Sequence, residues 1–179
     1  MDLNNEIKVY DDFLDIKVFL KMQQIILSED FPWFAAPVLH PEDPNVELAV
    51  EDKHNFQLYH MFFMNPYHQS PALDVIKPLL GELQPMFLIK AKANLNPVTD
   101  KNIEHGMHVD ISKNISNHSY TAVFYLNTNN GYTRFKTGEK IESLSNRLVV
   151  FPRGMQHTGA TCTDEPARVV LNLNFIKAE

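Results

Sequence analysis

Hydrophobic residues recur at two different spacings along the chain, and the change between them divides it into two parts. Residues 13–26 have the three- and four-residue spacing of an amphipathic helix, and the same spacing returns in residues 72–83. From residue 86 onward, hydrophobic and polar residues alternate instead, as in Phe87–Asn94 and Thr121–Asn127. Such alternation is typical of β-strands. The pattern therefore predicts helices in the first half of the chain and short strands in the second.

The order of these segments favours a mainly β fold with flanking helices. Leu148–Phe151 and Val169–Phe175 are further apolar strands, and Asn129–Gly131 and Thr137-Gly138 are predicted turns between strands. Runs of short strands with helices collected elsewhere form antiparallel sandwiches or barrels. We therefore expect residues 1–179 to form a single domain. In it, residues 1–85 are a helical or mixed supporting region and residues 86–179 are the β core, and Asp15 caps the first helix.

Composition narrows the functional classes. The chain has 179 residues and 44% hydrophobic content, which is enough for one core without covalent staples. Cys162 is the single cysteine, so an internal disulfide or a cysteine-based metal site is excluded and a cytoplasmic location is expected. Residues 1–10 do not have the pattern of a secretory signal, and no apolar stretch approaches the roughly 20 residues of a membrane span. The net charge of −6 and the absence of a basic stripe argue against a nucleic-acid partner.

Two histidines and a carboxylate in the second half have the identities of metal ligands. His108 and Asp110 are two residues apart, so on a strand their side chains point the same way, and His157 follows an apolar strand. Two imidazoles and one carboxylate cap one face of an octahedral metal and leave three positions open, as in non-haem Fe(II) oxygenases. Arg168 begins the last strand and offers a planar guanidinium that grips a carboxylate. Together these residues predict an Fe(II) enzyme that uses 2-oxoglutarate.

Each of these residues also has an ordinary explanation. The chain contains eight histidines, so a histidine two residues before an aspartate arises by chance. A lone histidine near a strand is more often a core or surface residue than a ligand. Arg168 would then be an exposed charge at a strand start, paired with Asp164 or Glu165. The metal site is favoured by the conjunction of all four residues in one β region.

The second half of the chain also resembles a known family. The residues that carry the similarity are Asn94-Leu95, His108-Val-Asp110, Thr121–Asn127, Gly131–Phe135, Asn146–Pro152, His157 and Arg168. They resemble the 2-oxoglutarate/Fe(II)-dependent dioxygenase superfamily and are most similar to its prolyl-4-hydroxylase-like branch, including small phage and bacterial members. The similarity covers residues 86–179, and nothing is carried over onto residues 1–85. It implies a double-stranded β-helix (jelly-roll or cupin-like) barrel in a protein of a bacterial or phage-infected cell.

The resemblance implies the cofactors and the roles of individual residues. Fe(II) would be held by His108, Asp110 and His157, with 2-oxoglutarate and O₂ as cosubstrates and ascorbate as a further candidate. Arg168 would bind the distal carboxylate of 2-oxoglutarate, and Tyr125 would donate a hydrogen bond to the same carboxylate. Ordinary packing within its strand is the alternative role for Tyr125.

Three further residues are candidates for the same site. Asn94 lies on the polar face of its strand, where it can bond the oxo-acid end of the cosubstrate. Lys92 shares that face and is a substitute for Arg168, since some relatives use a lysine. His105 cannot share a strand face with Asp110, because five residues separate them, and it is expected in a rim loop or near the substrate.

The expected reaction is hydroxylation of a C–H bond with release of succinate and CO₂. A prolyl residue in a peptide is the favoured substrate, although a small molecule also fits, and the sequence does not define the oligomeric state. Two alternatives stay open. One is a cupin-like metal-binding protein that acts as an isomerase or binds a ligand, and the other is a non-catalytic jelly-roll module. Arg168 discriminates between them, because a generic metal-binding barrel needs no cation at that position.

Overall fold

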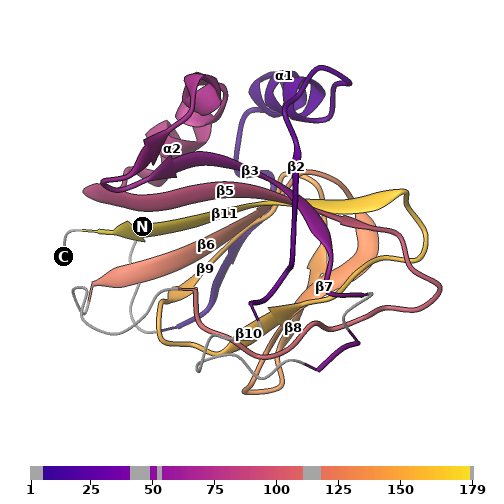
Figure 1. Ribbon diagram of the computed structural model, residues 1–179. Coiled ribbons are helices and arrows are strands. Elements are labelled where there is room, and N and C mark those ends of the chain that lie inside the picture. Colours follow the sequence, from indigo (N-terminus) through magenta and orange to yellow (C-terminus); the bar gives the residue numbers. More distant parts are fainter. Residues whose placement is uncertain (1–5, 41–48, 52–53, 111–117, 178–179) are drawn as a thin grey trace.

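In the described part of the chain, two antiparallel β-sheets face each other, and helices cover the outer side of the larger sheet (Figure 1). The structure is a computed structural model that describes residues 6–40, 49–51, 54–110 and 118–177. The larger sheet has the strand order β1-β9-β6-β11-β5-β3-β2, with β4 paired to β3. Its strands are β1 (Lys8–Tyr10), β2 (Phe34–Ala36), β3 (Gln57–Met64), β4 (His68–Gln69), β5 (Phe87–Pro97), β6 (Ser119–Tyr125), β9 (Leu148–Pro152) and β11 (Ala167–Ile176).

The smaller sheet has the order β10-β7-β8, formed by β7 (Asn129–Phe135), β8 (Lys140–Ser143) and β10 (His157–Gly159). An isolated antiparallel bridge between His108 and His157 places the segment that carries His108 beside β10. Two facing antiparallel sheets of this topology form the double-stranded β-helix that the sequence predicts, so that prediction is confirmed.

Helix α1 (Ile16–Ile26) begins where the sequence predicts. The side chain of Asp15 accepts hydrogen bonds from the backbone N–H groups of Lys17 and Val18, which satisfies two donors of the first turn. The second helical segment consists of a 3₁₀ turn, η2 (Pro71–Ile76), followed by α2 (Lys77–Leu83). None of the helices in the described residues has the length and apolar character that a bilayer crossing requires.

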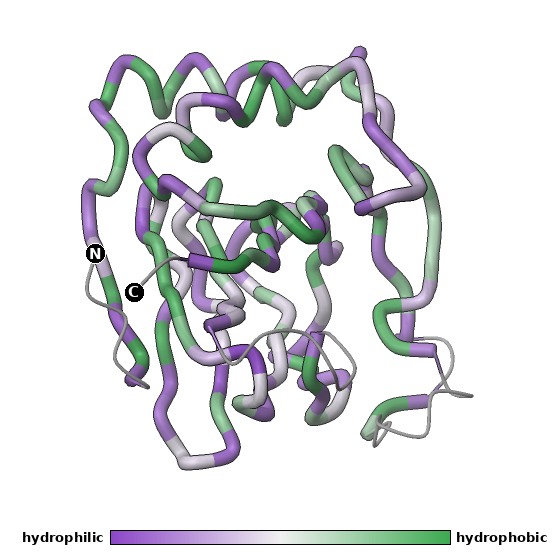
Figure 2. Tube along the Cα trace, turned by 90° about the vertical axis from the view of Figure 1, so that its left-hand side faces the viewer, coloured by the Kyte–Doolittle hydropathy of each residue, from purple (hydrophilic) through white to green (hydrophobic). Residues whose placement is uncertain are grey.

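Strand alternation creates two separate hydrophobic cores. Along β6, β9 and β11, one set of side chains faces the helices and the other set faces the smaller sheet. Figure 2 shows hydrophobic and hydrophilic positions following one another along the strands. The outer core joins the helices to the sheet through residues such as Phe19, Met22, Leu79, Phe124 and Leu173. The inner core lies between the sheets and contains Val123, Tyr125, Phe135, Val149, Phe151 and Val170.

The strand assignments hold with one exception. The mixed first half of the chain also supplies β1, β2, β3 and β4, which all belong to the larger sheet. The predicted turn at Asn129–Gly131 is wrong, since these residues begin β7. The chain changes sheets just before them, after β6, so no hairpin joins β6 to β7. The predicted turn at Thr137-Gly138 does join β7 to β8, and Gly138 has the positive φ of 102° that favours glycine.

Candidate metal centre

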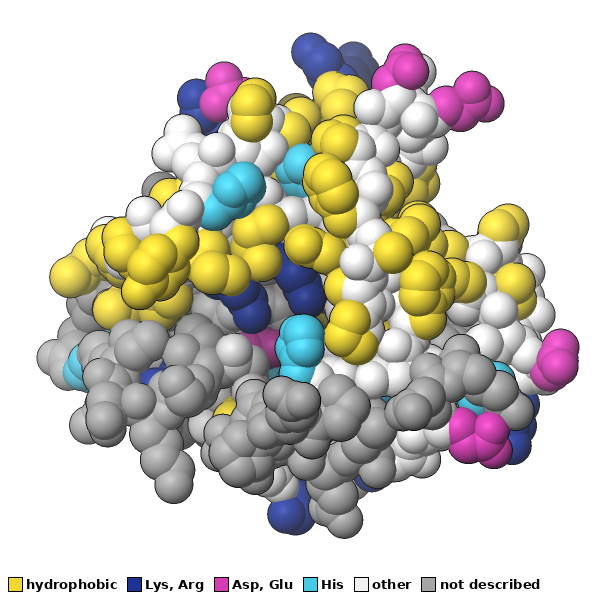
Figure 3. All heavy atoms as spheres, viewed as in Figure 1, with side chains coloured by type: hydrophobic (Ala, Val, Ile, Leu, Met, Phe, Trp, Pro, Cys, Tyr) yellow, Lys and Arg dark blue, Asp and Glu magenta, His cyan; other side chains and the backbone are white. Residues whose placement is uncertain are grey.

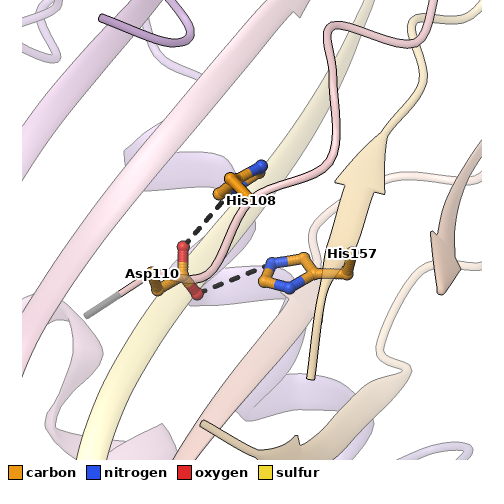
Figure 4. A group of neighbouring side chains, drawn as sticks. All are labelled: His108, Asp110 and His157. Atoms are coloured by element: carbon orange, nitrogen blue, oxygen red, sulfur yellow. Dashed lines mark ion pairs between the residues drawn. The ribbon is translucent and has the colours of Figure 1, made fainter. Parts of the chain in front are cut away.

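His108, Asp110 and His157 come together between the two sheets (Figure 4). The prospective ligand atoms of the three side chains all lie within 4.8 Å of one another. The Nε2 atom of His108 is 3.7 Å from Asp110 Oδ1, and Nε2 of His157 is 3.6 Å from Asp110 Oδ2. His157 starts β10, whereas His108 lies on the isolated bridge and Asp110 in a bend, so the predicted regular strand through the pair is wrong. The two side chains nevertheless point to the same place.

Backbone carbonyls orient both imidazoles toward this point. Nδ1 of His108 is 3.2 Å from the carbonyl of Gly106, and Nδ1 of His157 is 3.1 Å from the carbonyl of Met155. Since a carbonyl oxygen only accepts, each neutral ring carries its proton on Nδ1 and keeps the Nε2 lone pair for a metal. Burial lowers the pKa of His157, which keeps that ring neutral as a ligand must be.

Two asparagine amides from β11 hold the carboxylate. Nδ2 of Asn172 and Nδ2 of Asn174 donate to the same oxygen, Asp110 Oδ2, at 3.1 and 3.3 Å. Burial opposes ionisation of Asp110, but the neighbouring His157, His108 and Lys90 hold its pKa well below the usual range. Asp110 is therefore anionic, and its Oδ1 accepts no hydrogen bond from these amides. Two neutral imidazoles and one such carboxylate fit an octahedral Fe(II) with three open positions.

Arg168 lies in the same cavity as these three residues. The cavity has a volume of about 450 Å³ and is lined by His108, Asp110, His157 and Arg168 among others. Only 3% of Arg168 is exposed, and no carboxylate of the described residues forms an ion pair with it. Its Nε donates to Ser143 Oγ at 2.9 Å and its Nη2 donates to Thr133 Oγ1 at 3.0 Å. The alternative role of Arg168, an exposed charge paired with Asp164 or Glu165, is thereby excluded.

Two glycines leave the space that the guanidinium occupies. A Cβ on Gly131 would lie 2.7 Å from Arg168 Cδ and 2.9 Å from the backbone oxygen of Ala160. A Cβ on Gly159 would lie 3.3 Å from an Arg168 Nη atom. Gly159 is two residues from His157 on β10, which corresponds to about 7 Å along the strand. The guanidinium therefore lies beside Gly159, two residues along β10 from His157.

Buried amides without a partner face the same cavity. Asn94 and Asn96 both line it, and neither Oδ1 of Asn94 nor Nδ2 of Asn96 has a hydrogen-bond partner among the described residues. Asn96 is directly opposite Arg168 in the β5–β11 register. An unpaired buried amide costs free energy unless a ligand or water satisfies it. These two groups are therefore free to form hydrogen bonds with a polar ligand in the cavity.

The remaining predicted residues have different positions. Tyr125 is fully buried, and its hydroxyl donates to Thr133 Oγ1 at 2.8 Å beneath the Arg168 guanidinium, so direct donation to a cosubstrate stays a prediction. Lys92 lines the cavity but is level with Asn172, four residues along β11 from Arg168, and its role as a substitute also stays a prediction. His105 is 3% exposed and lines the cavity, with Nε2 3.1 Å from the carbonyl of His54.

Sequence reasoning missed several cavity residues. Asn96 continues the alternation of Lys92 and Asn94 on β5, so the period of two already placed it on this face. The partners of Arg168, Thr133 and Ser143, lie on two different strands of the smaller sheet, and no local pattern marks them.

No protein-family model matches the sequence, and no curated protein matches it either. Solved structures match the fold. A prolyl hydroxylase from Trichoplax adhaerens, in complex with a peptide fragment of the hypoxia inducible factor oxygen degradation domain, has a TM-score of 0.64 at 14% identity, over 97% of this chain and 84% of that one. A 2OG-Fe(II) oxygenase family oxidoreductase from Burkholderia pseudomallei has a TM-score of 0.66 at 12% identity, over 94% and 84%. A non-heme alpha ketoglutarate dependent epimerase from nogalamycin biosynthesis has a TM-score of 0.62 at 13% identity, over 97% and 77%. The chain therefore has the double-stranded β-helix fold of the 2OG-Fe(II) oxygenases.

Proposed function

We propose that this protein is an Fe(II)- and 2-oxoglutarate-dependent dioxygenase that hydroxylates a C–H bond and releases succinate and CO₂. The observation that carries the proposal is that the three metal-ligating side chains share one cavity with a buried arginine that has no carboxylate partner in the described residues. A buried charge is costly unless it is paired, so the guanidinium is explained by a ligand that brings the anion.

His108, Asp110 and His157 would hold Fe(II), which together with 2-oxoglutarate supplies the O₂ activation that oxidation of a C–H bond requires. Arg168 would bind the distal carboxylate of 2-oxoglutarate through two parallel hydrogen bonds. Its contacts with Ser143 and Thr133 fix the guanidinium in place before binding. The Thr133 hydroxyl accepts from both Tyr125 and Arg168, so its own proton remains to donate to the same carboxylate.

Apolar side chains separate the two ends of this site. Val123 and Val170 line the cavity and belong to the inner core between the sheets. They keep water away from the aliphatic part of a bound dicarboxylate, which strengthens the interactions at its two ends. Asn94 pairs with Val170 across the β5–β11 ladder and would supply a polar contact at this level.

The fold does not identify the substrate. One structural neighbour is a prolyl hydroxylase with a bound peptide, which makes a prolyl residue the first candidate, but another neighbour is an epimerase. Proteins of one fold can catalyse different reactions. A cupin-like metal-binding protein does not require a buried arginine at this position. The buried Arg168, which has no carboxylate partner in the described residues, therefore argues against that alternative.

The test is succinate formation by the protein loaded with Fe(II) under anaerobic conditions and then exposed to O₂ with 2-oxoglutarate. We expect succinate release even without substrate, at the low rate of uncoupled turnover, and at least a hundredfold loss in His108→Ala and Asp110→Ala. A variant of a structural histidine, His60→Gln, is the matched control because its ring bonds Pro32 and Ser70 away from the three ligands. Succinate release that survives both ligand substitutions would exclude the assignment.

A further inference from the structure

The cavity carries more positive charge than the proposed cosubstrate needs. Its charged lining residues in the described chain are Lys90, Lys92, Arg168 and Asp110, which are three cations and one anion. Fe(II) would add two positive charges and 2-oxoglutarate would add two negative ones. The charge of the two lysines then remains without a counter-charge.

The two lysines occupy one face of β5, beside the metal-ligating carboxylate. Across the ladder to β11, Lys92 pairs with Asn172 and Lys90 pairs with Asn174, which are the residues whose amides hold Asp110. Arg168 pairs with Asn96 instead, four residues along β11 from Asn172, or about 13 Å along the strand. The lysines therefore lie at the metal end of the cavity and not at the end where the distal carboxylate would bind.

Asp110 interacts with both lysines electrostatically, but neither lysine forms an ion pair with a carboxylate of the described residues. Among the described residues, no ion pair involves Lys90 or Lys92, and the contact of Lys92 is with the ring of Tyr59, 5.9 Å from its Nζ. Burial and, to a smaller extent, the neighbouring Lys90 lower the pKa of Lys92 to about 8, and the carboxylate of Asp110 opposes this shift. Two adjacent cations that repel each other and form no ion pair are the arrangement expected of a site that binds an anion.

Apolar side chains complete this part of the cavity. Met61 and Met64 of β3 are the cross-strand partners of Lys92 and Lys90, and both line the cavity. Figure 3 shows basic side chains, an acidic one and a histidine together in a hollow that hydrophobic side chains border. A molecule bound here would place an anionic group on the lysines and an apolar part on the methionine thioethers.

We propose that Lys90 and Lys92 bind an anionic group of the substrate that the enzyme oxidises. This substrate is accordingly a small acid that carries a carboxylate or a phosphate. This inference rests on the proposed function, because it assigns Arg168 to 2-oxoglutarate and the lysines to the second molecule. A neutral prolyl segment of a peptide offers the lysines nothing to bind. The cavity of about 450 Å³ must also hold the cosubstrate, which favours a small substrate.

The test uses the full-length protein loaded with redox-inert Zn(II) and saturated with 2-oxoglutarate, so that the metal and Arg168 are already occupied. Acetate, inorganic phosphate and the neutral isostere acetamide are titrated in turn while the lysine ε-methylene signals are followed by NMR. We expect the signals of Lys90 and Lys92 to shift with acetate or phosphate but not with acetamide. The acetate and phosphate arms separate a carboxylate substrate from a phosphate one.

Lys90→Met/Lys92→Met is the decisive variant. It should weaken binding of the anionic probe by at least about tenfold and leave the affinity for 2-oxoglutarate within about twofold. Lys17→Met, which removes an exposed charge from α1, is the matched control and should change neither. Absence of probe binding to the wild type, or binding that survives the double substitution, overturns the inference. Loss of 2-oxoglutarate affinity in the double variant overturns it too, since the lysines would then belong to the cosubstrate. Failure of the proposed function is distinguishable, because it appears as unchanged 2-oxoglutarate binding in Arg168→Met.

Discussion

Replacement of Arg168 with methionine separates a binding role from a structural one, because the two roles predict opposite results. The side chain is buried and donates to Ser143 and Thr133, with no carboxylate of the described chain beside it. If 2-oxoglutarate supplies the anion, the substitution leaves a carboxylate without its cation. Truncation of one partner of a buried charge pair costs about 2–5 kcal/mol. At 1.4 kcal/mol per tenfold, a mid-range loss of about 3 kcal/mol corresponds to a dissociation constant raised by about a hundredfold.

The same substitution has a different effect on folding of the ligand-free protein. It removes two hydrogen bonds that the charged guanidinium donates, worth about 1.5–3 kcal/mol each, and also removes a buried cation whose desolvation costs a comparable several kcal/mol. Methionine fills most of the same volume. We therefore expect the metal-free variant to be at least as stable as the wild type. If Arg168 instead has a structural role, the melting temperature of the variant should be lower.

Isothermal titration of 2-oxoglutarate into the Zn(II)-loaded proteins and thermal unfolding of the metal-free proteins measure the two quantities. Arg134→Met is the control, because Arg134 of β7 pairs with Glu104 and does not line the cavity, so its loss should not affect 2-oxoglutarate binding. Binding within about threefold of the wild type in Arg168→Met would refute the role assigned to the guanidinium.

Three other substitutions probe the site. Asn174→Leu should weaken Zn(II) binding by about 10–100-fold in a chelator competition, since it removes a donor that orients Asp110, and an unchanged affinity would show that this contact is irrelevant. Gly131→Ala should lower the free energy of unfolding by about 1–3 kcal/mol in denaturant unfolding, because the added Cβ would collide with Arg168 and the Ala160 backbone. Gly154→Ala is the control, because Gly154 has open space around it, and its stability should not change. Equal losses of stability in the two variants would contradict the close approach at Gly131. Burial lowers the pKa of His105 below its usual value of 6.5. As the pH drops below 6.5, the unfolded chain therefore binds a proton at this residue more readily than the folded chain, and the stability of the fold decreases. His105→Gln should make urea-unfolding stability fall less steeply from pH 6.5 to 5, and an identical slope would show that His105 is not the group responsible.

The sequence predicted the elements that depend on local patterns. Alternation identified β5 and β6, apolar runs identified β9 and β11, and the helix capped by Asp15 begins at the expected residue. The prediction of a turn at Asn129–Gly131 was wrong because asparagine and glycine occur in turns and also at positions within strands. Here Gly131 is needed for the close approach of Arg168, and Asn129 Oδ1 accepts from the backbone N–H of Gly131. A residue that makes room for a distant side chain looks, in sequence, like a residue that makes a turn.

The site was predictable in its ligands but not in its supports. His108, Asp110, His157 and Arg168 have side chains whose chemistry is informative by itself. The groups that orient them are two backbone carbonyls, two side-chain amides and two hydroxyls, and no local sequence pattern marks such groups as part of a site. Their importance appears only when the register pairs strands that lie far apart in the chain.

The β5–β11 register is what turns these separate residues into an ordered cavity. In one continuous ladder, Arg168 faces Asn96, Val170 faces Asn94, Asn172 faces Lys92 and Asn174 faces Lys90. Along this ladder, the proposed carboxylate-binding residue Arg168 comes first, the apolar Val170 follows, and the amides of Asn172 and Asn174 at the metal centre come last. Because side chains alternate with a period of two, a slip of one residue would move one strand's half of this set to the helix-covered face. The alternate residues of both strands are the apolar side chains of the outer core, such as Ala93, Leu171 and Leu173, so burial of that core enforces the register. The hydrophobic core under the helices therefore fixes the order of the charged groups on the other face of the same two strands.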